Sequence, residues 1–447
     1  MVGASLSKWT MSYFAAALLA LIAAEGLMVA GFGFPNAPIR GPETLVLVHL
    51  VAIGWLSMLM LGALFQFVPV LVARPLHSNR LPLPSLVLIL SGLAALLLGF
   101  LQMGGYLALP HSCFPAASAL LGAGVSLALW NLGRTLWAAR PLPISARFVT
   151  VGLASIAVTA LLGILFALTL GGVVSHPALL AIASQGVPVH AIVGLGGWLT
   201  FTAMGVSYRL LAMFMLAPEL DGASTRAAFH FGAVALALVI FGGVGLILLG
   251  GHLAFALAAA GTLGLVCVAI YWTDMVHLYR ARKRRVIELN SRMAGFALIS
   301  LGLAATLALA ATILGVLPRL AGAVAFLTAF GWLSGLGLAM LYKIVAFITW
   351  LECYGPVLGK MPTPRVQDLV VERRALPWFM IYFVAVWSGT VALLIEQATV
   401  FRVSAGAMTI ATVGLCIQFM HTRRLDHVLT LTSLPESGRP RLLMSAT

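Results

Sequence analysis

The chain has 447 residues, of which 62% are hydrophobic and only 9% are charged, and its mean hydropathy is +1.07. This composition excludes an ordinary soluble domain, because such a domain covers one apolar core with a polar surface. The net charge of +14 does not call for a nucleic-acid partner, since a membrane topology signal and anionic lipid headgroups account for it.

Apolar runs predict twelve transmembrane helices. A helix needs roughly 20 apolar residues to cross about 30 Å of hydrocarbon, and it satisfies its own backbone hydrogen bonds there. The expected spans are residues 11–33, 45–72, 82–104, 115–138, 146–173, 188–215, 226–250, 252–279, 292–316, 321–350, 376–396 and 403–421. The predicted fold is one all-α integral membrane domain over residues 1–447, in which residues 422–447 form a cytoplasmic tail.

The basic residues segregate to one side of these spans. They cluster after even-numbered spans, most densely between residues 280 and 285, whereas odd-numbered loops hold only Arg40, Arg319 and Arg402. Cytoplasmic loops of membrane proteins carry such an excess of Lys and Arg. We therefore expect a multi-pass protein of a bacterial inner membrane with both termini in the cytoplasm.

Several kinds of chemistry have no support in the sequence. The four cysteines, Cys113, Cys267, Cys353 and Cys416, are scattered without a C-x-x-C pair, so neither a disulfide framework nor a zinc site is indicated. No Walker loop, G-x-S-x-G elbow or H-E-x-x-H motif occurs. Hydrolytic and nucleotide-dependent catalysis are therefore not expected.

A short motif, Gly-Trp-Leu-Ser/Thr, occurs three times, beginning at Gly54, Gly197 and Gly331. The copies lie 143 and 134 residues apart, and each falls in the second span of a group of four. The simplest interpretation is packing, with small residues that let helices approach closely and tryptophans that anchor near the membrane interface. The spans then form three pseudo-repeated four-helix units, residues 11–138, 146–279 and 292–421.

Three charged residues inside the spans are candidates for a proton or ion path. Arg209 and Lys343 both lie twelve residues after a motif glycine, near the cytoplasmic end of their spans. They can instead simply extend to the interface, as long basic side chains often do. Glu25 lies deep in the first span, where an unpaired carboxyl is costly unless it is protonated or partnered, and it is the better candidate for a proton relay.

Two of the motif spans carry a histidine before the motif glycine. His49 runs through Gly54-Trp55 to Gln66-Phe-Val-Pro69, and His190 runs through Gly197-Trp198 to Tyr208-Arg209. With these residues, the helix plan resembles subunit I of the haem-copper oxidase superfamily. The similarity is closest to short relatives of cbb-type subunit I and to NnrS-type haem-copper membrane proteins of the nitric-oxide response. It implies three arcs of four helices, in which the second helix of each arc faces a central pore and carries a histidine near its outer end.

The resemblance also implies where cofactors would bind. In these oxidases the second span ligates a low-spin haem, the tenth ligates both haems, and the sixth and seventh ligate copper. Here His49 and His190 match the second and sixth spans, the tenth span has no histidine, and the seventh has only His230 near its cytoplasmic end. A complete oxygen-reducing centre is therefore not expected.

Imidazole is the usual protein ligand for haem iron and a good ligand for copper. We predict His49 and His190 as ligands of haem b or copper; the alternative is a hydrogen-bonded structural role. They precede their glycines by five and seven residues, which places them about 200° apart around a helix, so they can bind different groups. His111 and His252, at near-equivalent places in two outer loops, suggest a second copper site or solvated loop residues.

The favoured function is a haem-binding, and potentially copper-binding, membrane protein of redox or gas handling, oxidoreductase-like if it is an enzyme. Its expected partners are the lipid bilayer, a periplasmic electron donor or other membrane subunits. A twelve-helix transporter and a non-catalytic assembly subunit are the alternatives. Three groups of four spans argue against the transporter, since common transporter repeats are two groups of five or six.

Overall fold

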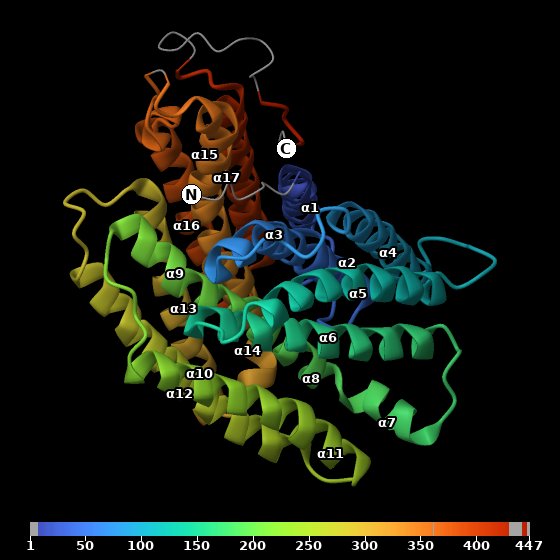
Figure 1. The fold of residues 1–447 in the computed structure, drawn as a ribbon. Helices are drawn as coiled ribbons and strands as arrows, with labels where there is room; N and C mark the ends of the chain where they lie inside the picture. Colours follow the sequence, from blue (N-terminus) through green and yellow to red (C-terminus); the bar gives the residue numbers. More distant parts are fainter. Residues whose placement is uncertain (1–7, 361, 429–439, 445–447) are drawn as a thin grey trace. The chain divides into compact units, whose positions relative to one another are not determined.

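The computed structural model describes residues 8–360, 362–428 and 440–444, and these residues form helices and loops without a strand (Figure 1). Twelve helical segments of this part of the chain are long and apolar enough to cross a membrane. The predicted all-α membrane class is confirmed. The predicted tail begins inside the last helix, and its residues 429–439 and 445–447 lie outside the described residues.

The observed spans follow the predicted ones closely, because long apolar runs bounded by polar residues leave little freedom in where a span lies. Each predicted run overlaps one observed span. The observed spans are Thr10–Ala30, Pro42–Val72, Pro82–Met103, Phe114–Ala138, Ile144–Leu170, Val187–Met215, Ala223–Leu248, Leu253–Arg280, Leu289–Ile313, Leu317–Val357, Glu372–Leu394 and Ala398–Arg424.

Residues Met1–Gln66 and Ile287–Thr447 form one of two compact units, unit 1. Here α16 packs against α17, α1 packs against α17 and η1, and α13 packs against α15. The tenth span, which contains α15, has the largest buried share, 72% of its most apolar window. The elements of unit 1 are α1 (Thr10–Ala30), α2 (Pro42–His49), η1 (Leu50–Ser57), the first part of α3 (Met58–Val72), α13 (Leu289–Ile313), α14 (Leu317–Phe326), η4 (Leu327–Ser334), α15 (Gly335–Tyr354), η5 (Gly355–Val357), η6 (Val366–Leu369), α16 (Glu372–Leu394) and α17 (Ala398–Arg424).

Residues Phe67–Val286 form the second compact unit, unit 2. Here α4 packs against α5, α5 against α6, and α10 against α12; α4, α5 and α6 lie side by side in Figure 1. The elements of unit 2 are the last part of α3, α4 (Pro82–Met103), α5 (Phe114–Ala138), α6 (Ile144–Leu170), α7 (Pro177–Gln185), α8 (Val187–Ile192), η2 (Val193–Phe201), α9 (Thr202–Met215), α10 (Ala223–Ala237), η3 (Leu238–Gly242), α11 (Gly243–Leu248) and α12 (Leu253–Arg280).

Local sequence explains where many of these helices begin and end. Pro82, Pro115, Pro188 and Pro318 all lie in the first turn of their helices. Proline costs no hydrogen bond there, because the first N–H groups of a helix have no partner inside it. α1 ends at Gly31, whose φ of 79° is the left-handed conformation that glycine adopts without steric cost.

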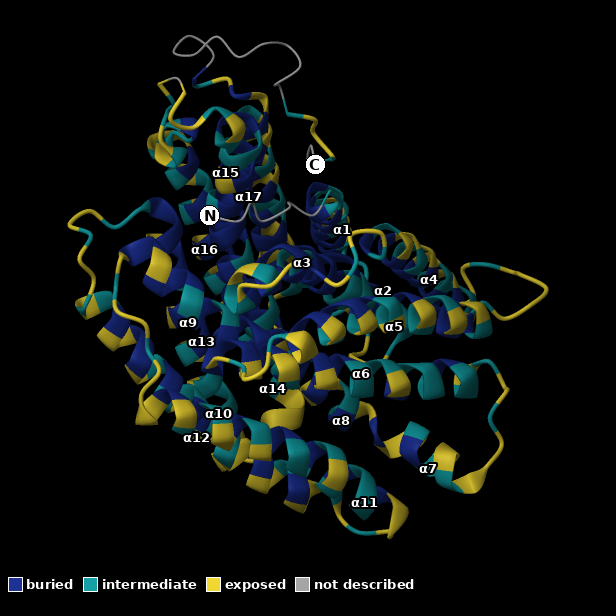
Figure 2. Cartoon of the chain, viewed as in Figure 1, coloured by how far each residue is buried: buried dark blue, intermediate teal, exposed yellow. Residues whose placement is uncertain are grey.

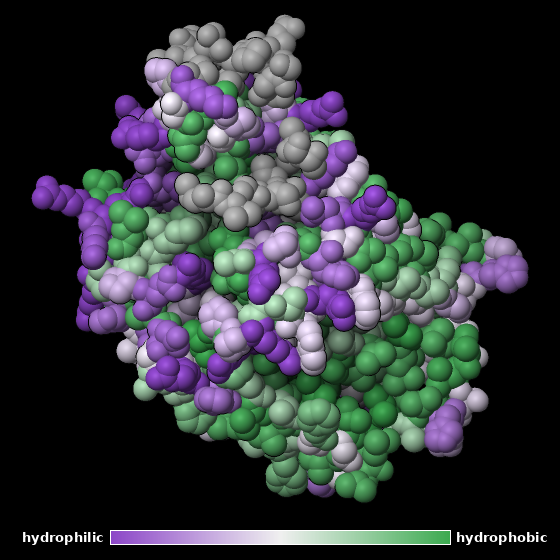
Figure 3. All heavy atoms as spheres, in the orientation of Figure 1, coloured by the Kyte–Doolittle hydropathy of each residue, from purple (hydrophilic) through white to green (hydrophobic). Residues whose placement is uncertain are grey.

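Hydrophobic side chains cover much of the outside of both units. Along α12, exposed and intermediate residues predominate, although this helix is strongly apolar (Figure 2). The helices of unit 2 on the right of Figure 3 also present a largely hydrophobic face. On a soluble protein such a surface would cause association, whereas in a bilayer it is the surface that contacts lipid.

Candidate functional site

The three copies of the Gly-Trp-Leu-Ser/Thr motif share a backbone conformation that the sequence did not reveal. Each copy lies in a π-helix, η1, η2 or η4, within an otherwise α-helical span. π-helices are rare, hydrogen-bond over five residues instead of four, and occur frequently at functional sites. The shared conformation supports the equivalence of the copies and marks the surrounding residues as the first place to look for a site.

The motif tryptophans lie in the interior of the protein. Trp55, Trp198 and Trp332 are 0%, 2% and 0% exposed, so the expectation that they anchor at the membrane interface is wrong. In unit 1, Trp55 Nε1 donates to Ser334 Oγ over 2.7 Å, and that hydroxyl donates to the Ala329 carbonyl five residues earlier. The first and third motif copies are therefore joined by a buried hydrogen bond.

Two of the three motif glycines have the packing role that was expected. A Cβ on Gly197 would lie 2.8 Å from the Cβ of Ser155 on α6, and a Cβ on Gly331 would lie 2.8 Å from the Cβ of Ser300 on α13. Atoms do not approach so closely without moving the backbone, so both positions require glycine. In each case the partner is a serine on the preceding span.

His49 is the last residue of α2, immediately before η1. Its Nδ1 lies 2.8 Å from the Leu45 carbonyl of the same helix, and the side chain is half-buried. Because a carbonyl oxygen only accepts, Nδ1 carries the proton, and in neutral imidazole the lone pair is on Nε2. This hydrogen bond fixes both the tautomer and the direction of the ring.

His190 lies in α8, just before η2, and its ring packs against α6. A Cβ on Gly163 would lie only 3.2 Å from His190 Cε1, and the centre of the Phe166 ring is 5.4 Å from that of the imidazole. The missing side chain at Gly163 thus leaves room for the ring. His49 belongs to unit 1 and His190 to unit 2, so each histidine is described within its own unit.

The two outer-loop histidines lie in ordinary loop surroundings. The backbone carbonyl of His111 accepts a hydrogen bond of 3.0 Å from Gln102 Nε2. His252 precedes α12, and its ring is 6.1 Å from that of Phe255. Across the part of the chain that the structure describes, no three His, Cys, Asp or Glu side chains gather closely enough to hold a metal ion.

Arg209 and Lys343 each form an ion pair. Arg209 pairs with Glu219, and Lys343 Nζ lies 2.6 Å from Glu288 Oε2, with both of the latter side chains less than 15% exposed. Each cation therefore has a carboxylate partner, and the ion path through them stays a prediction. The partners were hard to foresee, because each lies outside the apolar run that contains its cation.

Glu25 is the only acidic residue of the first span, Thr10–Ala30, and its side chain has no exposed surface. Thr412 of α17 donates to its Oε1 over 2.9 Å, whereas Oε2 has no hydrogen-bond partner among the described residues. An ionised carboxylate in such a place costs much more than the neutral acid. We therefore expect Glu25 to hold a proton, as a proton relay requires in one of its states.

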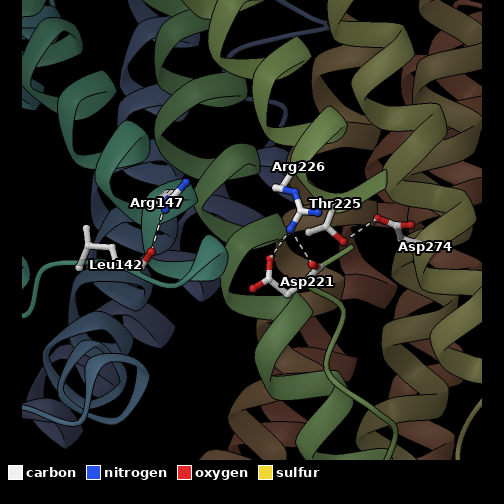
Figure 4. Close-up of polar contacts among 6 residues, drawn as sticks. All are labelled: Leu142, Arg147, Asp221, Thr225, Arg226 and Asp274. Atoms are coloured by element: carbon white, nitrogen blue, oxygen red, sulfur yellow. Dashed lines mark hydrogen bonds and ion pairs between the residues drawn. The ribbon is translucent and has the colours of Figure 1, made fainter. Parts of the chain in front are cut away.

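The sequence patterns did not predict two groups of buried polar side chains. Asp274 of α12 accepts hydrogen bonds from the hydroxyls of Tyr208, Ser224 and Thr225 at 2.7, 2.5 and 3.3 Å, the last of which is drawn in Figure 4. It thereby ties α12 to α9 and to the first turn of α10. A single acidic residue inside an apolar run was the signal that could have identified it.

The second missed group is an ion pair at the end of α17. Arg423 Nη1 lies 2.6 Å from Glu352 Oε2, and the two side chains are 2% and 4% exposed. Arg423 also donates to the hydroxyl of Thr349 and to the backbone carbonyls of Arg441 and Met444. Arg423 is one of the basic residues that follow the twelfth predicted span, and it is buried and holds the C-terminal segment.

No protein-family model and no curated protein matches the chain. The case for a function therefore depends on the residues themselves. Of these, His49 and His190 combine a position inside a span, a fixed ring and a neighbouring π-helix.

Proposed function

We propose that the protein binds haem b within the membrane and handles electrons or a small gas, on a scaffold related to subunit I of the haem-copper oxidases. The observation that carries this proposal is the 2.8 Å hydrogen bond between His49 Nδ1 and the Leu45 carbonyl. Histidines that ligate metals almost always donate their other ring N–H in this way, which orients the ring and makes it more basic. His49 is thus prepared to ligate iron through Nε2.

Haem would supply one-electron or gas-binding chemistry, and the chain supplies its ligand and surroundings. His190 is the second proposed ligand, of haem or copper, with its ring positioned by Gly163 and Phe166. The donor set also limits the proposal. Because no group of three such ligands occurs among the described residues, it includes neither a three-histidine copper site nor a complete oxygen-reducing centre.

The same proposal places the protein in a bacterial inner membrane with both termini in the cytoplasm. The support is the concentration of Lys and Arg after even-numbered spans. His49 and His190 both lie near the first residues of their spans, at the end away from the loops that are rich in Lys and Arg. They would therefore be close to the periplasm, where a soluble electron donor or another membrane subunit can approach.

The test is the absorbance spectrum of the purified protein. We expect a haem Soret band and a reduced-minus-oxidised difference spectrum in the unaltered chain, both lost in His49→Ala. His49→Met should keep the haem with a shifted spectrum, because a thioether also ligates haem iron. His230→Ala is the matched control, since His230 is also on a spanning helix and packs beside Phe229.

Two outcomes would contradict the proposal. One is a colourless preparation without iron or copper, which would favour the transporter or the assembly subunit. The other is a coloured preparation whose spectrum is the same in His49→Ala, which would move the ligand to another residue.

A further inference from the structure

An open groove of about 270 Å³ lies between α5 and α6, at the arginine-rich end of these helices. Leu129, Leu136 and Trp137 line it from α5, and Leu153 and Ala154 line it from α6. Thr150 also lines the groove, but its hydroxyl donates to the Ala146 carbonyl of its own helix over 2.9 Å. Apart from Arg140, which also lines the groove, the surface that the groove offers to a ligand is therefore apolar.

Gly133 keeps the groove open. It lies on the α5 side of the lining, and a Cβ added there would meet no atom within 4 Å. Unlike the motif glycines, it is not required for the close approach of another helix. A larger side chain at this position would fill the groove without disturbing the fold.

Three arginines lie at or near this end of the two helices, and Arg140 itself lines the groove. The guanidinium of Arg140 lies 3.6 Å from the centre of the Trp137 ring, and that of Arg134 lies 5.5 Å from the centre of the Trp130 ring. Arg147 donates to the carbonyl of Leu142, which lines the groove (Figure 4). Stacking on an aromatic face orients a guanidinium while leaving its N–H edge available for a phosphate.

These arginines lie in a long part of the sequence that contains no carboxylate. The sequence contains no Asp or Glu between Glu43 and Glu219, a stretch that includes all of α4, α5 and α6. Arg134, Arg140 and Arg147 therefore leave an excess of positive charge at the end of an apolar groove. A ligand that complements both features has an anionic head and a hydrocarbon tail.

We propose that the groove between α5 and α6 binds an anionic phospholipid, with one acyl chain along the apolar lining and the phosphate on Arg140 and Arg147. Basic pockets between membrane helices are known to recognise anionic headgroups in this way. The site is independent of the proposed haem ligands.

The test is a thermal-stability titration of the full-length protein in detergent with phosphatidylglycerol, together with mass spectrometry of the lipid that co-purifies. We expect phosphatidylglycerol to raise the unfolding midpoint of the unaltered chain. Arg140→Gln should weaken the response by about fivefold in lipid concentration, the effect expected of one arginine at an anionic surface. Gly133→Leu should abolish the response and remove the co-purifying lipid.

Two variants serve as matched controls. Gly261→Leu adds the same side chain to α12, where a Cβ also meets no atom within 4 Å. Arg282→Gln removes an exposed arginine that does not line the groove. Both should respond like the unaltered chain. An equal response to phosphatidylcholine or to inorganic phosphate, or a full response in Gly133→Leu, would overturn the proposal.

Discussion

Arg423 shows how strongly burial changes the contribution of one charged side chain to stability. Its ion pair with Glu352 is almost completely enclosed, whereas the pair of Arg319 and Glu396, with N···O of 2.7 Å, is 67% and 64% exposed. Removing one partner of a buried pair leaves an uncompensated charge away from water. An exposed pair is screened, and its loss is compensated by solvent.

We therefore expect Arg423→Ala to lower the free energy of unfolding by about 3–5 kcal/mol, and Arg319→Ala, the matched control, to lower it by about 0–1 kcal/mol. The measurement is unfolding in mixed micelles of increasing denaturing detergent. Equal losses in the two variants would show that the burial of Arg423 is not maintained in the membrane protein.

Individual site residues were predictable to the extent that they interrupt an apolar run. Glu25, His49 and His190 stand out for that reason. Their partners did not, because the contacts join distant parts of the chain: Thr412, which bonds Glu25, is 387 residues away. The tautomer of His49 depends on where its ring points, which the residue type does not determine.

At the scale of elements, the π-helices are the main feature that sequence patterns missed. A run of apolar residues predicts a helix but does not distinguish an α-helix from a π-helix when the helix is hydrophobic on every side. The hydroxyl of Ser57 donates to Ala52 and that of Ser334 to Ala329, in each case five residues back. These bonds match the wider turn and help to hold it.

The hydrogen bond between Trp55 and Ser334 should contribute to stability as a pair. Ser334→Ala should cost about 1–3 kcal/mol, because it leaves the Trp55 N–H buried without its acceptor. The stability loss of the double variant, Ser334→Ala with Trp55→Phe, should be smaller than the sum of the two single losses by at least about 0.5 kcal/mol. Unfolding free energies of the four proteins in this double-mutant cycle measure the difference.

Thr328→Ala is the control for this cycle, because the Thr328 hydroxyl donates to the Val324 carbonyl of its own helix. It should change stability little, with or without Trp55→Phe. Strict additivity of Ser334→Ala and Trp55→Phe would mean that the bond between the first and third motif copies contributes nothing.

For the whole molecule, the number and position of the spans were predictable, because the thickness of the lipid bilayer sets the length of each apolar helix. The division into two compact units was not. The repeats suggested three groups of four spans, whereas unit 1 combines the first two spans with the last four, and the boundary after Gln66 falls inside α3. This division depends on packing between segments that are distant in the sequence, and the spacing of the repeated motif does not predict it.

The predicted orientation is tested by labelling single cysteines in a background without Cys113, Cys267, Cys353 and Cys416. Ser175 and Lys283 are both exposed and lie in loops of opposite predicted side. On intact cells a membrane-impermeant maleimide should label Ser175→Cys, because its loop is predicted to face the periplasm, and should label Lys283→Cys only after permeabilisation. The reverse pattern would place both termini outside the cytoplasm.

The extra residue in each turn of a π-helix also affects how related chains should be compared. A second span with one residue fewer within residues 50–57 could continue as an α-helix while its later side chains keep nearly the same faces, because the wider turns of the π-helix absorb about one extra residue. Gln66, now 5% exposed, would then stay close to its present position. A single-residue deletion in these segments thus need not rotate the half-span that follows, and an alignment without a gap there would pair residues from different faces.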